Sequence, residues 1–179
     1  MLGGSLKSLK SGHCDVFPLL NPPFEGLSHV VQTPKLFHSM SNILLVDDHP
    51  VMRALLRQVL EAYPDIVIVA EAEDGEEAVR LATKFQPDVA IIDLHLPRLS
   101  GVQATKLIRL QSPCTAIIGL TAGEPDDREM EIISAGASAL LNKADVFREL
   151  HRSIVKAVRL AAFYPAQLNK PVSDYKAGS

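Results

Sequence analysis

Five polar residues, each close behind an apolar run, are the residues of this 179-residue chain whose types could do chemistry together. They are three acids, a hydroxyl and an ammonium: Asp47, Asp48, Asp93, Thr121 and Lys143. Three carboxylates gathered in one place repel one another, so such a group is favourable only with a hard divalent cation. Mg²⁺ takes one or two protein carboxylates and completes its octahedron with water and phosphate oxygens. The residue types therefore point to a site for a hard divalent cation.

The apolar runs before these residues are typical of buried parallel strands. We expect five strands, at residues 43–46, 66–70, 89–92, 116–120 and 139–141. Helical patterns follow each strand, and their expected starts are Pro50, the capping box 74–77, the cap at 100–103, the region of Pro125, and Asp145. We expect the fourth of these helices to end at Gly136, a residue type favoured just past a helix. The alternation predicts one α/β domain over residues 41–163, with a doubly wound parallel sheet.

The topology of such a sheet brings the five polar residues together, because ligands bind at the carboxyl ends of its strands. The second run ends in Ala70-Glu71, so we place that strand at an edge of the sheet. Helical spacing also predicts which apolar side chains face the sheet. The apolar stripes that we expect to face inward include Leu55, Phe85, Leu107 and Phe147.

The two ends of the chain differ from this regular middle. Residues 1–40 hold four of the 12 prolines and show no lasting apolar period, which predicts a flexible or loosely docked N-terminal extension. Residues 164–179 also lack a period, and we interpret them as a C-terminal tail.

Composition excludes several classes of protein. A net charge of -3 gives no strong field toward nucleic acid or anionic membranes. The two cysteines form no C-x-x-C pair, which argues against a zinc ribbon or a thioredoxin-like site. No apolar run reaches the roughly eighteen residues of a membrane span, and the N-terminus lacks a signal peptide's apolar core. We therefore expect a cytoplasmic protein that makes no membrane contact.

Four segments carry a resemblance to a known family. They are Leu45-Val46-Asp47-Asp48-His49, the stretch 93–101 (DLHLPRLSG), Leu120-Thr121-Ala122, and the stretch 136–143 (GASALLNK). In order and spacing they resemble the receiver domain of bacterial two-component response regulators, over about residues 43–160. The ending Lys143-Ala144-Asp145 most resembles receivers that precede a LuxR-type helix-turn-helix. The resemblance implies a flavodoxin-like, three-layer α/β/α fold with strand order 2-1-3-4-5.

The resemblance also implies how Mg²⁺ is held, with Mn²⁺ able to substitute. Asp48 and Asp93 would be direct ligands, the backbone carbonyl of His95 would be the third protein ligand, and Asp47 would act through water. The side chains of His49 and His95 themselves are expected near the site without binding metal.

The family's chemistry assigns the remaining residues. Asp93 would be the nucleophile that takes a phosphoryl group to form an acyl phosphate. The Lys143 ammonium would neutralise the phosphoryl oxygens, and the Thr121 hydroxyl and the Ala122 backbone N–H would donate hydrogen bonds to them. Gly101, eight residues after Asp93, either only begins a helix after a turn or also shapes this site.

The partners implied are a sensor histidine kinase or a phosphotransfer protein as donor. The output would pass to a downstream protein or a second copy, through the face of the fourth helix, fifth strand and last helix, or through the first and last helices. Such a protein is a phosphoacceptor in a phosphorelay, with no enzyme activity beyond removal of its own phosphoryl group.

Two residues depart from the family's pattern. Most receivers have Tyr or Phe where this chain has Leu140, which puts the usual aromatic switch in doubt. Many have proline after the lysine, where this chain has Ala144, so we do not expect a cis peptide bond there.

Other functions stay open at this point. A Mg²⁺-dependent phosphoesterase similar to the haloacid dehalogenases would need an acid two residues after Asp93, where His95 stands. The chain could instead be the receiver part of a longer DNA-binding regulator, since the 15 residues after Tyr164 are too few for a helix-turn-helix and we expect no nucleic-acid contact within this chain. A receiver that only docks partners is a third alternative, against which Asp93, Thr121 and Lys143 argue.

Overall fold

The computed structural model describes residues 40–123 and 127–163, and the statements below concern those residues. The predicted extension before Met40 and the predicted tail after Phe163 lie outside them. Strands and helices alternate in the order β1 (Ser41–Val46), α1 (Pro50–Glu61), β2 (Ile66–Ala72), α2 (Gly75–Phe85), β3 (Val89–Asp93), α3 (Gly101–Gln111), β4 (Ala116–Thr121), α4 (Asp127–Ser134), β5 (Ala139–Asn142) and α5 (Val146–Phe163).

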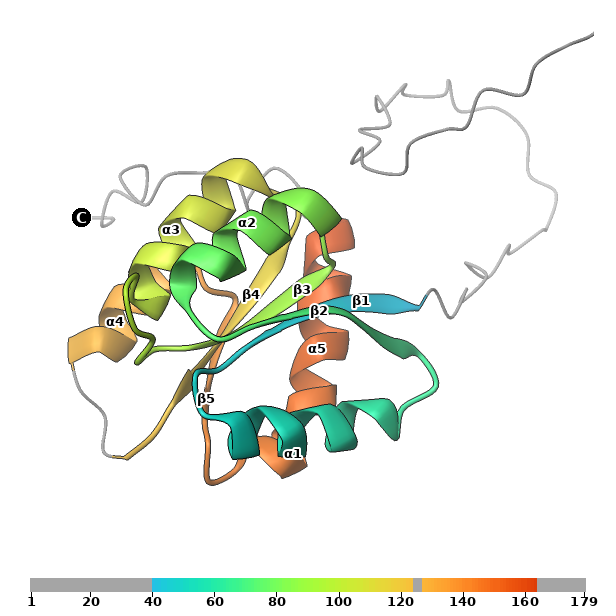
Figure 1. Cartoon of the computed structure of the whole chain (residues 1–179). Coiled ribbons are helices and arrows are strands. Elements are labelled where there is room, and N and C mark those ends of the chain that lie inside the picture. Colours follow the sequence, from blue (N-terminus) through green and yellow to red (C-terminus); the bar gives the residue numbers. More distant parts are fainter. Residues whose placement is uncertain (1–39, 124–126, 164–179) are drawn as a thin grey trace, which may run out of the picture. The chain divides into compact units, whose positions relative to one another are not determined.

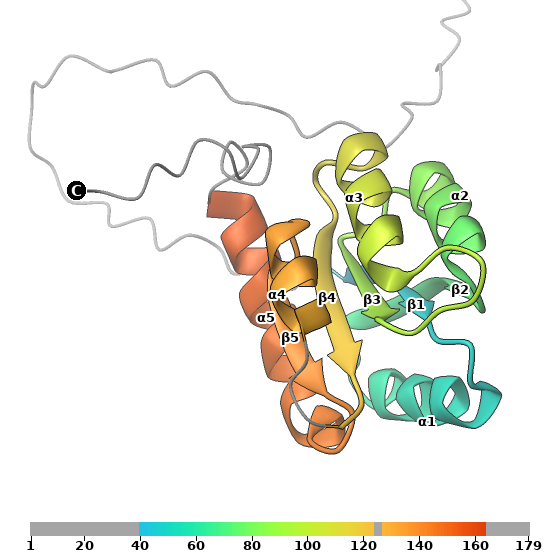
Figure 2. The ribbon, with the colours of Figure 1, turned by 90° about the vertical axis from the view of Figure 1, so that its left-hand side faces the viewer.

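The strands form one parallel sheet in the order β2-β1-β3-β4-β5, with helices on both faces (Figures 1 and 2). The expected flavodoxin-like, three-layer fold is therefore confirmed, and β2 lies at an edge as predicted. Between β1 and β2 the register shifts once, between Ile43 and Leu44.

The core consists of two main layers, one on each side of the sheet. One layer packs α1 and α5 against residues of β1, β3 and β4, and it includes Leu56, Leu60, Leu150 and Ile154. The other packs α2 and α3 against the opposite face. A smaller cluster of Leu94, Val102 and Ile132 lies where α4 meets the sheet and α3. The middle residues of the central strands are apolar because both faces of these strands are covered.

Local signals in the sequence set the helix ends. Ser100 and Gln103 form a full capping box at the start of α3, and Asp74 caps α2 by accepting from the Glu77 N–H at 2.8 Å. Gly136 follows α4 with a φ of +103°. The N–H groups of Gly136 and Ala137 donate back to Ile133 and Ile132, which is the hydrogen-bond pattern of a Schellman motif.

The predicted start of the fourth helix near Pro125 lies outside the described residues, and the described part of α4 begins at Asp127. One prediction about the helices needs correction. Four side chains predicted to face the sheet are between 37% and 45% exposed, namely Leu55, Phe85, Leu107 and Phe147. Each belongs to an apolar stripe of its helix, but only some residues of that stripe pack in the core. In α5, for example, the row that packs inward begins at Val146.

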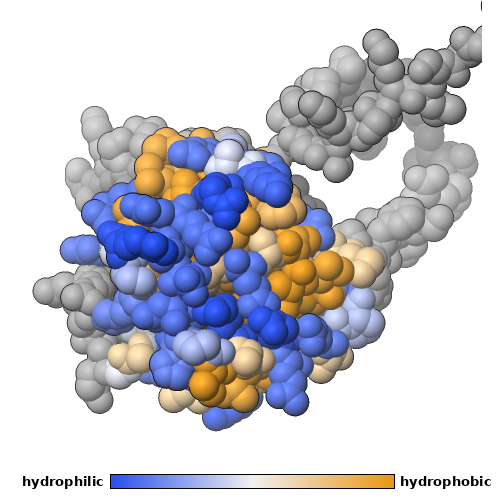
Figure 3. Space-filling model, in the orientation of Figure 1, coloured by the Kyte–Doolittle hydropathy of each residue, from blue (hydrophilic) through white to orange (hydrophobic). Residues whose placement is uncertain are grey.

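Figure 3 shows a face that is mostly hydrophilic, with separate hydrophobic areas. Among the described residues, no helix combines the length and the apolar character needed to cross a bilayer.

Candidate functional site

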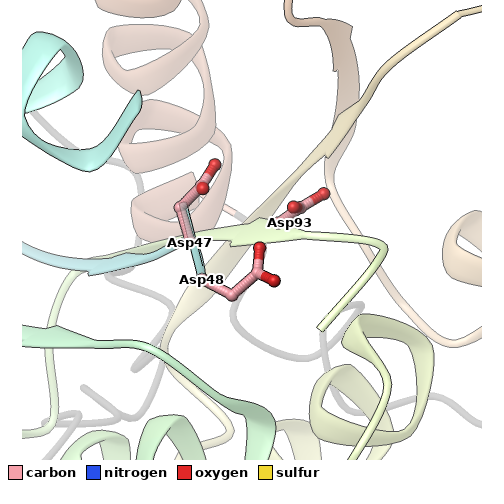
Figure 4. Close-up of side chains that lie close together, drawn as sticks. All are labelled: Asp47, Asp48 and Asp93. Carbon is pink, nitrogen blue, oxygen red and sulfur yellow. The ribbon is translucent and has the colours of Figure 1, made fainter. Parts of the chain in front are cut away.

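The candidate site lies at the carboxyl ends of β1, β3, β4 and β5. Asp47 and Asp48 directly follow β1, and Asp93 is the last residue of β3. Figure 4 shows these three side chains close together, and one carboxylate oxygen from each lies within 4.8 Å of the others. Asp47 and Asp93 are buried, whereas Asp48 is exposed. The parallel topology thus brings together acids that are 46 positions apart in the sequence.

Lys143 bridges the two buried acids. Its Nζ lies 2.8 Å from Asp47 Oδ2 and 2.8 Å from Asp93 Oδ2. Burial alone would lower the pKa of Lys143, but its contacts with Asp47 and Asp93 outweigh this effect and raise the pKa above its ordinary value. Lys143 is therefore a charged ammonium at neutral pH.

The cluster still carries an excess of negative charge. Three carboxylates and one ammonium sum formally to −3 + 1 = −2. Among the described residues, the buried Asp47 Oδ2 has no partner besides its ion pair with Lys143. An all-oxygen donor set with two surplus negative charges fits a hard divalent cation such as Mg²⁺.

Hydrogen bonds to the backbone hold the acids in place. Asp47 Oδ1 accepts from the His49 N–H at 2.9 Å, and Asp93 Oδ1 accepts from the His95 N–H at 3.2 Å. Each acid therefore orders the turn that follows its own strand. The oxygen of Asp93 that faces Lys143 is Oδ2, so the two oxygens of this side chain have different donors.

Thr121 and Lys143 are placed by the pairing of β4 with β5. Thr121 is buried and lies opposite Asn142 in the parallel register. The Lys143 N–H then donates to the carbonyl oxygen of Thr121 at 2.7 Å, which fixes the start of the lysine side chain. Ala122 follows at the exposed end of β4.

Glycines allow the loop between β3 and α3 to pack tightly. A Cβ atom at Gly101 would lie 2.1 Å from the carbonyl oxygen of Asp93, and one at Gly75 would lie 2.1 Å from that of Leu99. Gly101 therefore does more than begin a helix, because its missing side chain lets α3 approach the backbone of Asp93.

The two histidines beside the acids have separate positions. His49 is the N-cap of α1, and its Nδ1 accepts from the Met52 N–H at 3.4 Å. The His95 side chain is exposed. Neither belongs to the three-acid cluster found in the described part of the chain.

Sequence reasoning missed Arg53, which contacts the backbone of the site. Its Nη1 donates to the Asp47 carbonyl oxygen at 2.6 Å, and its Nε lies 3.4 Å from Glu71 Oε2 on β2. The pair Arg53–Glu71 joins a helix to a strand, so no fixed spacing in the sequence predicts this contact. A signal was present only in Glu71, an acid on an otherwise apolar strand.

The sequence of this chain is similar to those of known proteins. A family model described as "Response regulator receiver domain" matches residues 43–155. The transcriptional regulatory protein LiaR of Bacillus subtilis is 39% identical over 134 residues, which are 75% of this chain and 62% of that protein. A protein-glutamate methylesterase/protein-glutamine glutaminase of Nitrosospira multiformis is 42% identical over 106 residues, 57% of this chain and 29% of that protein. The chain thus spans less than two thirds of the length of these relatives.

The fold of this chain also matches solved structures. The response regulator domain of Thermotoga maritima CheB matches with a TM-score of 0.63 and 30% identity, covering 67% of this chain and 97% of that one. A LuxR-family two-component response regulator from Aurantimonas sp. SI85-9A1 matches with a TM-score of 0.64 and 35% identity, covering 68% and 86%.

Proposed function

This chain belongs to the response regulator receiver domain family, and from that premise we propose that Asp93 is its phosphoacceptor. The chain carries the receiver domain of a two-component response regulator. The observation that supports the assignment most is the position of Asp93, beside two further acids and 2.8 Å from the Lys143 ammonium. Lys143 and the following turn contact Asp47 as well as Asp93, but the Asp47 side chain is fully buried and that of Asp93 is 5% exposed, so Asp93 is the more accessible of the two.

In the proposed step a carboxylate oxygen of Asp93 forms a bond to phosphorus. The bond between phosphorus and the leaving group breaks, and the leaving group departs on the opposite side with the bonding electron pair. Lys143 shifts its contact from the free carboxylate to the phosphoryl oxygens, where its charge is needed. The Thr121 hydroxyl and the Ala122 N–H donate hydrogen bonds to the same group.

We propose that Asp48, Asp93 and the backbone carbonyl of His95 hold Mg²⁺ directly, and that Asp47 does so through water. When bound, the cation supplies positive charge that offsets the charge of the phosphoryl oxygens. Asp47 is fully buried whereas Asp48 is exposed, which is consistent with an indirect role for Asp47. Mn²⁺ meets the same demands for oxygen ligands.

Chelation provides the first test of this function. A small phosphodonor is expected to add one phosphoryl group per chain in the presence of Mg²⁺, as measured by intact mass. EDTA should reduce the labelled fraction by at least tenfold, because the excess negative charge of the acids would then repel the donor. Labelling that is equally fast in EDTA would contradict a metal-dependent site.

The partners follow from the same proposal. The donor would be a histidine kinase or a phosphotransfer protein in the cytoplasm. Two faces expose apolar side chains that could pass the signal on to a protein or to a second copy. They are the α4–β5–α5 face, with Met130, Ile133 and Phe147, and the α1–α5 face, with Val51, Leu55 and Leu160.

The output of the whole protein is a separate proposal. The relatives include transcriptional regulatory proteins and methylesterases that are longer than the matched region. Receiver domains are mostly not enzymes, and we propose that this one removes only its own phosphoryl group. We propose that the receiver acts on a DNA-binding part, as in a transcriptional regulator.

The structural change on phosphorylation should involve α4. Leu140 and Ile132 both approach β4 at Gly119, where a Cβ would lie 2.8 Å from Ile132 and 3.0 Å from Leu140. If Thr121 moves toward the phosphoryl group, Leu140 can fill the space behind it but can make no new polar contact. Among residues 130–134, the part of α4 whose burial is described, only Ile132 is fully buried, while Met130 and Ile133 are exposed, so this helix can adjust at low cost.

Amide hydrogen exchange measures this change. A beryllofluoride mimic of the phosphoryl group should alter exchange in a peptide spanning 127–134, and the Asp93→Asn variant should show no such alteration. Changes confined to β5 and α5 would contradict the route through α4.

A further inference from the structure

A partly buried arginine on α1 contacts the backbone of the acidic site. The Arg53 side chain is 18% exposed, and its Nη1 donates to the Asp47 carbonyl oxygen at 2.6 Å. Arg53 lies in the first turn of α1, where its own N–H donates to the carbonyl of His49. Its side chain therefore reaches back over the turn that carries Asp48. A hydrogen bond from a charged guanidinium is stronger than one between neutral groups.

This bond fixes the peptide group between Asp47 and Asp48. The peptide is planar, so the Asp47 carbonyl and the Asp48 N–H turn as one unit. Asp47 is also held at its N–H, which donates to the Ala72 carbonyl at 3.2 Å, and at its Oδ1, as described above. With the carbonyl bound as well, the orientation of the peptide group that precedes the exposed Asp48 is held.

Arg53 is itself anchored from β2. Its Nε lies 3.4 Å from Glu71 Oε2, and Glu71 lies opposite Leu45 in the register of β1 with β2. Arg57, one turn further along α1, donates from its Nε and Nη2 to the two oxygens of Glu71 at 2.5 Å each. This contact raises the pKa of Arg57 above its ordinary value. Glu71 is thus a fixed carboxylate between two arginines of α1. One of them, Arg53, also donates a hydrogen bond to the Asp47 carbonyl oxygen.

We propose that Arg53 is a positioning residue, whose guanidinium, anchored by Glu71, orients the Asp47–Asp48 peptide so that the acids can bind a divalent cation. This inference rests on the proposed function, since it assumes that the acids hold Mg²⁺ or Mn²⁺. The planar guanidinium of Arg53 can contact Glu71 and the Asp47 carbonyl oxygen at the same time, whereas a lysine would offer one compact charge on a flexible side chain.

The charge and the hydrogen bond of Arg53 act in opposite directions on cation affinity. A positive charge near three acids repels a cation, so loss of the charge alone would tighten binding in Arg53→Gln. Loss of orientation weakens binding, by about tenfold or more when a group that orients metal ligands is removed. The sign of the change therefore separates positioning from simple electrostatics.

The experiment measures Mn²⁺ affinity directly, on the full chain and without phosphodonor, by electron paramagnetic resonance of free Mn²⁺. The variants are Arg53→Gln, Arg53→Lys and Arg57→Gln, with thermal melting to check folding. Arg57→Gln is the matched control, because it removes the same charge from the same helix and contacts the same Glu71. We expect Arg53→Gln to bind at least tenfold more weakly than wild type, Arg53→Lys to lie between them, and Arg57→Gln to stay within twofold of wild type.

The outcomes are separable. Binding by Arg53→Gln that equals or exceeds wild type would overturn the inference alone, as would an equal loss in Arg57→Gln. If Arg53→Gln does not fold, Arg53→Lys carries the test, and affinity within twofold of wild type would overturn the inference. A wild type that binds no Mn²⁺ would overturn the proposed metal site together with the inference.

Discussion

Asp93→Asn is expected to leave the protein without a phosphoryl label under conditions that label the wild type fully. The substitution keeps the shape of the side chain but replaces the carboxylate by an amide, which is a far weaker nucleophile. Lys143 lies 2.8 Å from both Asp93 and Asp47, but the Asp47 side chain is fully buried whereas that of Asp93 is 5% exposed, so Asp93 is the acid beside the ammonium that an incoming phosphoryl group can reach. Intact mass after reaction with a small phosphodonor and Mg²⁺ is the measurement.

Asp88→Asn is the matched control for this prediction. Asp88 comes just before β3, at the opposite end of the strand, where its Oδ2 accepts from the Asn42 N–H at 2.7 Å. The same chemical change there should leave the labelled fraction within twofold of wild type. A label that persists in Asp93→Asn would place the acceptor elsewhere.

Gly101→Ala is expected to destabilise the fold by about 2 kcal/mol or more, although alanine is the better helix former by about 1 kcal/mol. The added Cβ would lie 2.1 Å from the Asp93 carbonyl oxygen and 2.9 Å from the carbonyl carbon. Both are backbone atoms, so no side-chain rotation can relieve the overlap, and either α3 or the end of β3 must move. We expect the melting temperature to fall by roughly 5–10 °C, and labelling of Asp93 to slow as well.

Gly123→Ala separates this overlap from the general cost of losing a glycine. A Cβ at Gly123 would meet no atom within 4 Å, but its φ of +99° is unfavourable for alanine. The expected loss is about 1 kcal/mol, which is the cost of the backbone conformation alone. Equal stabilities of Gly101→Ala and wild type would show that α3 does not need its close approach to Asp93.

The fold could be predicted from the sequence because each element carried its own local signal. Apolar runs marked the strands, and the caps at Asp74 and Ser100 marked helix starts. The topology then required the residues after β1, β3 and β5 to lie near one another, and the structure places Asp47, Asp93 and Lys143 in direct contact. The strands extend one or two residues further than predicted because backbone pairing continues past the apolar run, for example to the polar Asp93 and Thr121.

The remaining features depend on contacts between distant segments. Phe147 is exposed while Val146 is buried, because neighbouring residues of a helix point in different directions and only the packing of α5 against the core decides which of them faces inward. The bridge from Arg53 to Glu71 joins residues 18 positions apart on different elements, and either side chain alone resembles an ordinary surface charge. The N-cap role of His49 was missed because histidine is not among the preferred capping residues.

The measurement that tests the central claim most directly is the location of the phosphoryl group in the wild-type protein. The labelled chain is treated with borohydride, which reduces an acyl phosphate to an alcohol and leaves a stable mark, and peptides are then sequenced by mass spectrometry. The account predicts the mark on Asp93 and on no other acid of the site. A mark on Asp47 or Asp48, or an unreduced label on His49 or His95, would contradict it.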